Sequence, residues 1–275
     1  MLWAVLLAPA VIPQTWLHGL GGRAPASLRF YFDVAGLLSL FVAGWVMRRW
    51  VDRSTPDFKW SGRAQPWSDF TWGLVGGLGW LAASLGMICL LGGLRFAPEG
   101  GLAGSTLGLA VISLLLNATV QEVLARGYVF ELMRRRAGPG WAVLISAAFF
   151  TLIHAAAFPG NLWPMLNVFL AGVLFSLIRL RTGGLATGIG VHYAWNLLVG
   201  PILGLAVSGR DLSDGWRLLQ LQGPDWLTGG AFGIEGSMVV TLITTIICLA
   251  VGFWDVGKFL ELHASQAQPD KDVMS

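Results

Sequence analysis

The sequence predicts an all-α fold, a polytopic transmembrane helix bundle of seven or eight spans. Two features of its composition favour this class: 55% of its 275 residues are hydrophobic, and only 12% are charged. Soluble domains carry about 25% charged residues. A third feature is that the apolar residues gather in stretches long enough to cross a bilayer. Together these features exclude a soluble enzyme, a disordered chain and a nucleic-acid-binding protein.

Seven stretches satisfy the need for about 20 mainly apolar residues across about 30 Å of hydrocarbon. They are residues 30–47, 70–92, 104–133, 139–158, 163–178, 184–205 and 237–254. Residues 2–20 are also apolar but contain Pro9, Pro13 and His18, so they form either an eighth span or a helix at the membrane interface. We favour the span.

The distribution of basic residues predicts the topology, because Lys and Arg concentrate in cytoplasmic loops. If the loops alternate, 12 basic residues fall on one side and 5 on the other, with Arg126 inside a span. We therefore expect a multi-pass cell-membrane protein with a cytoplasmic C-terminus. One integral membrane domain would contain N-terminal helices (1–95), a motif-bearing core (96–205), an interfacial loop helix with the last span (206–262), and a polar tail (263–275).

Two glycines in the predicted span 70–92 have the spacing of closely packed membrane helices. Gly73 and Gly77 are four residues apart, which places them on one helix face. Small residues at this spacing let two helix backbones approach closely. We interpret the pair as a packing site and not as part of a functional site.

Several polar residues lie inside the predicted spans, where a charged side chain at a helix centre costs about 2.5–3.5 kcal/mol on the insertion scale. They are Gln121, Glu122, Arg126, His154, His192 and Asn196. Glu122 shares a helix face with Arg126, and His192 shares one with Asn196. Counted along the helix from the nearest basic residues, Glu122 and His192 lie at similar depths of about 18 and 17 Å. We expect the set to meet in one layer of the bundle.

Each of these residues also has a structural explanation. Glu122 and Arg126 could form a buried ion pair that fixes helix register. A single histidine within a membrane is often a hydrogen-bonded core residue, and Asn196 could link two helices. The joint occurrence of all of them at a similar depth favours a functional site.

The residue types indicate hydrolysis of an amide inside the membrane. A carboxylate and two imidazoles can activate water for attack on a carbonyl, either through a metal ion or by general-base catalysis. In this hypothesis Glu122 activates the water, and His154 and His192 bind a metal or polarise the reactants. Asn196 would donate to the oxyanion, while Arg126 orients Glu122. If a metal is used, its ligands are Glu122, His154 and His192, and Zn²⁺ is the candidate ion.

At these residues the chain resembles the CAAX-processing and bacteriocin-immunity family of intramembrane endopeptidases, the CPBP or Abi family. The family motifs Glu-Glu-x-x-x-Arg, Phe-x-x-x-His and His-x-x-x-Asn/Asp correspond, in order, to Gln121–Arg126, Phe150–His154 and His192–Asn196. The resemblance covers about residues 117–200. It implies a multi-helix protease core, with the catalytic site formed by the acidic positions and the histidines. Whether such a site uses a metal or a glutamate-activated water stays open.

One position departs from the family pattern. The first acidic residue, which in this family looks like the general base, is Gln121 here, and an amide cannot take up a proton near neutral pH. Glu122 could take over after a modest rotation, hydrolysis could have been lost while the pocket still binds, or an introduced Glu-to-Gln change could trap a substrate. We favour a natural variant that still hydrolyses, with Gln121 hydrogen-bonded near the site.

Other membrane enzymes would show motifs that the sequence lacks. It contains no His-Glu-x-x-His and no Gly-x-Ser-Gly, and Asp33 is the one aspartate well inside a predicted span. The sequence therefore predicts a metallo- or glutamate-type intramembrane endopeptidase acting on a membrane-embedded or membrane-associated protein or peptide, with no nucleic-acid partner. The alternative is a non-proteolytic scaffold or immunity protein on the same fold. Neither the substrate nor the oligomeric state follows from the sequence.

Overall fold

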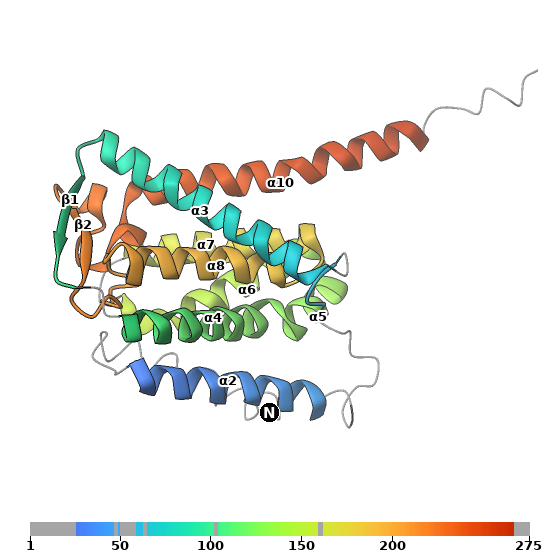
Figure 1. The fold of residues 1–275 in the computed structure, drawn as a ribbon. Helices are drawn as coiled ribbons and strands as arrows, with labels where there is room; N and C mark the ends of the chain where they lie inside the picture. Colours follow the sequence, from blue (N-terminus) through green and yellow to red (C-terminus); the bar gives the residue numbers. More distant parts are fainter. Residues whose placement is uncertain are drawn as a thin grey trace, which may run out of the picture.

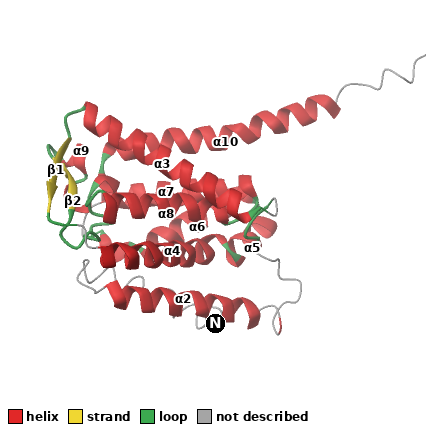
Figure 2. Ribbon diagram, in the orientation of Figure 1, coloured by secondary structure: helices red, strands yellow, loops and turns green. Residues whose placement is uncertain are grey.

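The computed structural model describes residues 26–46, 49, 59–62, 65–101, 104–158 and 162–266, and this part is mostly helical. The helices are α2 (Ala26–Val46), α3 (Pro66–Leu90), α4 (Gly104–Arg126), α5 (Tyr128–Ala137), α6 (Pro139–Ile153), η2 (Ala155–Ala157), α7 (Leu162–Thr182), α8 (Ala186–Leu197), η3 (Leu198–Ile202), α9 (Asp225–Thr228), η4 (Gly230–Phe232), η5 (Ile234–Gly236) and α10 (Met238–Gln266). The strands are β1 (Leu94–Glu99) and β2 (Arg217–Leu221), which lie at one end of the molecule (Figure 2).

The long helices form a layered bundle with α8 in its interior (Figure 1). α3 and α10 lie on one side of the bundle, and α4 followed by α2 lies on the other. α8 packs against both α3 and α4, while α7 packs against α6 and α10. Nearly all side chains of α8 are buried, including His192 and Asn196. The central position of this helix brings its polar residues against α4, which carries another of the three motifs.

Within the described residues, three helices are long and apolar enough to cross a membrane: Pro66–Leu90, Leu107–Ala137 and Leu162–Thr182. Shorter apolar helices cover Phe30–Val46, Pro139–Ile153 and Met238–Phe253. Large apolar side chains point outward, among them Leu90 and Trp72, which are 83% and 66% exposed. Extended apolar surfaces of this kind are typical of contact with lipid. The predicted first span, 2–20, lies outside the described residues, so the count of seven or eight stays a prediction.

The predicted span 104–133 is divided at Gly127 into two helices, α4 and α5. The Gly127 N–H bonds to the Val123 carbonyl at 2.9 Å. A Cβ atom at position 127 would lie only 2.2 Å from that oxygen, so a side chain does not fit. The turn therefore requires glycine, and the basic residues 134–136 lie on a separate short helix.

The segment 206–236 differs from the predicted interfacial helix. It contains β2 and the short helices α9, η4 and η5, and β2 pairs with β1 in an antiparallel two-stranded sheet. Gly229 and Gly233 have φ values of 79° and 84°, which glycine adopts without strain and which interrupt a continuous helix. The all-α prediction therefore holds for the bundle but misses this small sheet, because its strands lie far apart in the sequence.

Glycines mediate the contact between α3 and α8. A Cβ atom at Gly73 would lie 2.3 Å from the Thr187 carbonyl oxygen, and one at Gly190 would lie 2.4 Å from the Phe70 carbonyl oxygen. At Gly77, the nearest atom would be the Val191 carbonyl oxygen at 2.7 Å. The predicted packing role of Gly73 and Gly77 is confirmed, and Gly190 supplies the matching surface of α8.

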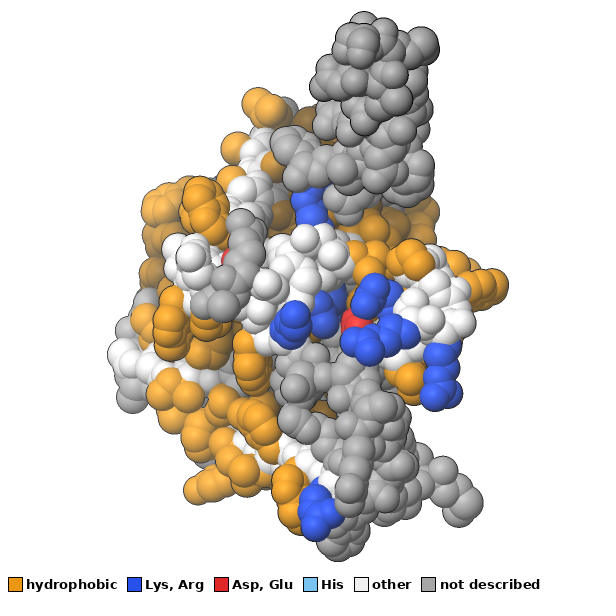
Figure 3. Space-filling view, turned by 90° about the vertical axis from the view of Figure 1, so that its right-hand side faces the viewer, with side chains coloured by type: hydrophobic (Ala, Val, Ile, Leu, Met, Phe, Trp, Pro, Cys, Tyr) orange, Lys and Arg blue, Asp and Glu red, His pale blue; other side chains and the backbone are white. Residues whose placement is uncertain are grey.

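The end of the bundle at which α5 lies carries a cluster of basic residues around one carboxylate, and Figure 3 looks onto this end. Glu131 accepts hydrogen bonds from Arg134 at 2.7 Å and from Arg135 at 2.8 Å, and the Arg179 guanidinium lies 4.0 Å away. Arg134 and Arg135 lie on α5 and Arg179 lies on α7, and the charge distribution assigns these basic residues to the same side of the membrane. The structure thus gathers them at one end, opposite the β1–β2 sheet (Figure 1).

Candidate functional site

Four of the six predicted site residues line one small cavity inside the bundle. The cavity has a volume of about 50 Å³ and is lined by Trp80, Asn117, Gln121, Phe150, His154, Asn167, Val168, Ala171, Phe175, His192, Trp195, Asn196, Val207, Ser208, Arg210, Glu235 and Val240. A buried water needs about 10–15 Å³ of such space and two to four polar partners. The cavity therefore has room for a few water molecules, whereas a peptide could enter only if the surrounding helices move.

The other two predicted residues, Glu122 and Arg126, stand behind His192. Arg126 Nη1 donates to Glu122 Oε1 at 3.2 Å, and the same oxygen lies 3.1 Å from His192 Nδ1. Glu122 and Arg126 are 1% and 0% exposed. Because a carboxylate only accepts hydrogen bonds, the His192 proton lies on Nδ1 when the ring is neutral, which leaves the Nε2 lone pair available. The three side chains thus form a chain in which Arg126 fixes Glu122 and Glu122 orients His192.

Arg126 is held from several sides. Its Nη2 donates to the Gly172 carbonyl at 2.8 Å, and its Nε donates to Ser176 Oγ at 3.4 Å. The guanidinium also lies over the Phe150 ring, 4.5 Å from the centroid, in a cation–π contact. A buried charge is tolerated when it is paired and its donors are satisfied. Phe150, the first residue of the Phe-x-x-x-His motif, therefore helps to hold Arg126.

His154 terminates α6 and lines the same cavity. Its Nδ1 lies 2.7 Å from the Phe150 carbonyl oxygen, which can only accept, so Nδ1 is the donor. The neutral ring therefore keeps a lone pair on Nε2, as His192 does. Its ring packs on Phe150 at a centroid distance of 4.7 Å. The motif spacing Phe-x-x-x-His thus places a backbone acceptor four residues before the imidazole, and this acceptor fixes the tautomer.

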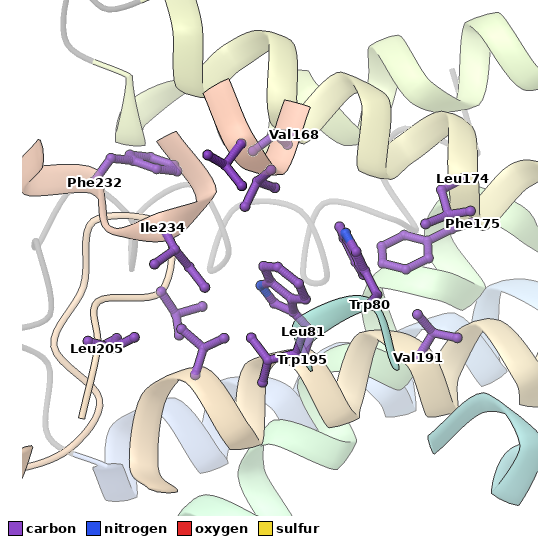
Figure 4. Packing of buried hydrophobic residues seen from close by; sticks show 14 of the residues in the cluster. Trp80, Leu81, Val168, Leu174, Phe175, Val191, Trp195, Leu205, Phe232 and Ile234 are labelled. Atoms are coloured by element: carbon purple, nitrogen blue, oxygen red, sulfur yellow. The ribbon is translucent and has the colours of Figure 1, made fainter. Parts of the chain in front are cut away.

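An aromatic cluster lies beside Asn196 at the cavity wall. Trp195 stacks on Trp80 with ring centroids 3.9 Å apart, and Trp80 meets Phe175 edge to face (Figure 4). Phe175 in turn stacks on His192, with centroids 5.1 Å apart. These rings restrict the rotation of His192 and keep apolar surface around the polar residues. Asn196, one residue after Trp195, also lines the cavity and supplies an amide donor.

Comparison with known proteins finds a family match for the segment that carries the three motifs. Residues 103–198 match the protein family described as type II CAAX prenyl endopeptidase Rce1-like. This segment is an Rce1-like domain of the CAAX-processing and bacteriocin-immunity family. The match includes every predicted site residue, and it ends at residue 198, one residue after the end of α8. No curated protein and no solved structure matches the chain significantly.

The neighbours of Gln121 explain why an amide suits this position of the Rce1-like domain. Asn117 Nδ2 donates to the buried Asp33 carboxylate at 2.9 Å. This bond orients the Asn117 amide so that its Oδ1 faces Gln121, one turn further along α4. Gln121 Nε2 donates to that Oδ1 at 2.9 Å. A carboxylate at position 121 would place two acceptors against each other, because Asp33 fixes the orientation of Asn117. The departure from the family motif is thus matched by its surroundings.

Two ionisable residues of the cavity, Arg210 and Glu235, escaped the sequence analysis. Glu235, in η5, lies outside the Rce1-like domain, yet its half-buried side chain lines the cavity together with His154 and His192. Burial raises the pKa of its carboxyl, while hydrogen bonds from Trp195 and Ser208 oppose the rise. The sequence signal was weak, since the residue follows a glycine-rich stretch without helical periodicity. The available clue was that Glu235 is a single acidic residue between residues 231–234, which carry no polar side chain, and the last predicted span.

The residues present do not form the predicted metal centre in this arrangement. No group of three or more His, Cys, Asp or Glu side chains among the described residues is placed to hold a metal ion. Glu122 Oε1 and His192 Nδ1 bond to each other, and His154 Nδ1 bonds to a backbone oxygen. His154 and His192 are the two members of the predicted ligand set that both line the cavity, whereas catalytic zinc sites have three protein ligands.

A direct measurement of the zinc content tests the metal-dependent form of the sequence hypothesis. From this side-chain arrangement we expect the purified, full-length protein to contain well below one zinc ion per chain by elemental analysis. The protein should be prepared without chelators, and His154→Ala protein should be measured in parallel. About one zinc per chain in the native protein, lost in the His154→Ala variant, would contradict the expectation and restore the metal mechanism.

Proposed function

We propose that this protein is a multi-pass intramembrane endopeptidase that hydrolyses a peptide bond with water activated by His192. The observation that carries the proposal is the buried chain Arg126–Glu122–His192, which ends at a water-sized cavity also lined by His154 and Asn196. The match to a family of CAAX prenyl endopeptidases supports peptide-bond hydrolysis as the reaction class. The substrate class is a membrane-embedded or membrane-associated protein or peptide.

The proposed roles differ in one respect from those expected from the sequence. Glu122 was expected to activate water itself, but its Oε1 bonds to both Arg126 and His192, and its side chain does not line the cavity. An orienting carboxylate behind a histidine base is the more suitable role, since it fixes the tautomer and stabilises the imidazolium. His192 Nε2 is then the base, and His154 Nε2 accepts a second hydrogen bond from water in the cavity.

The reaction follows from these roles. His192 Nε2 takes one proton from water as the water oxygen bonds to the carbonyl carbon of the scissile peptide. Asn196 donates a hydrogen bond to the oxygen that becomes negative. The imidazolium then returns its proton to the amide nitrogen as the C–N bond breaks, which leaves an amine and a carboxylic acid. The low exposure of the site keeps these interactions away from bulk water and so strengthens them.

The test is a mass-spectrometric survey of new protein termini in membranes from cells that carry the native chain or His192→Ala at equal abundance. The matched control is Val191→Ala, a buried neighbour on α8 that does not line the cavity. We expect a set of termini that is present with the native chain and the control and that falls at least about 100-fold with His192→Ala. Those termini would also identify the substrates.

The competing function is a non-proteolytic scaffold or immunity protein on the same fold. The amide at Gln121, in place of the acid of the family motif, is the observation that favours it. Identical sets of termini in native, His192→Ala and Val191→Ala membranes would overturn the endopeptidase proposal and support this alternative.

A further inference from the structure

Glu235 belongs to the cavity although it lies far from the motifs in the sequence. It lies in η5, within the segment that connects η3 to α10, and 37 residues beyond the end of the Rce1-like domain at residue 198. Among the residues that line the cavity, the ionisable ones are His154, His192, Arg210 and Glu235. Glu235 is therefore the carboxylate that faces the cavity directly, whereas Glu122 lies behind His192.

The hydrogen bonds of the Glu235 carboxylate orient it and leave room for one more donor. Trp195 Nε1 donates to Oε1 at 2.7 Å. Ser208 donates twice to Oε2, through its backbone N–H at 2.6 Å and its hydroxyl at 2.9 Å. A carboxylate offers about four acceptor positions. The three donors occupy three of these positions and are all neutral, so the fourth position, on Oε1, can accept from water in the cavity.

The backbone around Glu235 is fixed as well. Asn167 Nδ2, on α7, donates to the carbonyl oxygens of Glu235 at 2.8 Å and of Ser237 at 2.9 Å. Thr241, on α10, donates to Asn167 Oδ1 at 2.6 Å. The backbone at Glu235 is thus attached to α7, which is itself bonded to α10, while the carboxylate is attached to Trp195 on α8 and to Ser208. A charged group held this firmly needs little reorganisation when charge develops beside it.

The basic residues around the cavity favour an anionic side chain at position 235. His192 acts electrostatically on Glu235, and Arg210 and His154 act on each other across the same cavity. In the proposed reaction His192 becomes positively charged when it takes the proton from water. An ionised carboxylate across the cavity stabilises that charge, and the neutral amide of Gln121 does not.

We infer that Glu235 is a catalytic residue of this site, the carboxylate that holds the attacking water and balances the charge gained by His192. This inference rests on the proposed function and names a residue that the family motif does not contain. It also accounts for Gln121, because the acid that the motif places on α4 comes here from η5. The role requires the ionised form, so cleavage should fall at low pH as Glu235 takes up a proton.

The first test is Glu235→Gln in the full-length chain, with cleavage measured on the His192-dependent termini between about pH 5 and about pH 9. We expect cleavage to fall about 100-fold at the pH values where Glu235 is ionised, and by less at the lowest pH, where the native carboxyl is protonated as well. The amide would place an NH₂ group against one of the three donors, so the amount of folded variant must be checked by size-exclusion chromatography in detergent.

The second test keeps the carboxylate and changes its pKa. Ser208→Ala removes one hydrogen bond that favours the ionised form, so the low-pH limb of the cleavage profile should move up by about one pH unit. Ser213→Ala is the matched control, because that hydroxyl bonds to Asp211 and does not line the cavity. A purely structural role for Glu235 would change the amount of folded protein without moving the profile.

The outcomes separate this inference from the proposed function. Loss of cleavage by folded Glu235→Gln protein supports the inference. If that variant does not fold, the upward shift of the low-pH limb in Ser208→Ala supports it alone. Native-like cleavage by Glu235→Gln, or an unmoved profile with Ser208→Ala, overturns it while the endopeptidase proposal stands. A native chain without His192-dependent termini overturns both.

Discussion

Glu122→Leu is expected to lower the Tm of the protein by about 10 °C and to abolish cleavage. The substitution leaves the Arg126 guanidinium buried without its carboxylate, and breaking a buried ion pair from one side costs about 3–5 kcal/mol. For a domain of this size each kcal/mol corresponds to about 2–4 °C. His192 Nδ1 also loses the acceptor that fixes its tautomer, which costs a histidine-based site about 10⁴-fold in rate. Thermal unfolding in detergent and the survey of termini measure the two effects.

The double variant Glu122→Leu, Arg126→Met separates stability from chemistry. Replacing both members of a buried pair by apolar residues of similar volume is often neutral or stabilising. We therefore expect the Tm to return to within a few degrees of the native value while cleavage stays absent. Recovery of cleavage along with the Tm would show that the pair is structural only, and it would remove Glu122 from the proposed site.

Gly73→Leu should prevent the normal contact between α3 and α8 and lower the amount of folded protein sharply. Even the first side-chain atom at position 73 would meet the Thr187 carbonyl oxygen at 2.3 Å and the Gly190 Cα at 2.9 Å. Both are backbone atoms, so the helices must separate, and the cost exceeds the 1–3 kcal/mol of ordinary overpacking. Because α8 carries His192 and Asn196, cleavage per folded molecule should fall as well.

Gly79→Leu is the matched control for this prediction. It lies on the same helix, and a Cβ atom there would have no other atom within 4 Å. A glycine in a helix interior costs about 1 kcal/mol relative to a good helix former, so this variant should be as stable as the native chain or slightly more so. Equal loss of folded protein for both variants, measured by size-exclusion chromatography, would contradict the assigned packing role of Gly73.

The helical period explains which parts of the site were predictable. A carboxylate and an arginine four residues apart on a helix meet on one face, and Glu122 and Arg126 do. The same rule placed His192 with Asn196, and both line the cavity. Similar depths along separate spans then indicated that the histidines and Glu122 would meet, and Glu122 does bond to His192.

The orientation of one helix against another could not be derived from the helical period. The rotation of α4 against α8 decides that Glu122 faces His192 and that Gln121 faces the cavity, and one helical step of 100° separates these two orientations. The hydrogen bond from Gln121 to Asn117 likewise could not be derived from the sequence. Asn117 lies one turn away on the same helix, but its orientation depends on Asp33 of α2, which is 84 residues distant.

The sequence by itself determined the helical membrane character, the approximate position of most helices, the three motifs and the residues that form the Arg126–Glu122–His192 chain. Only the tertiary structure decided that Glu122 supports His192 from behind, that Gly127 divides the predicted third span, and that Glu235 reaches the cavity. The physical reason is that composition and periodicity depend on neighbours within one helix. The face that each helix turns inward, and the path of an aperiodic segment such as 206–236, depend on packing between residues far apart in the chain.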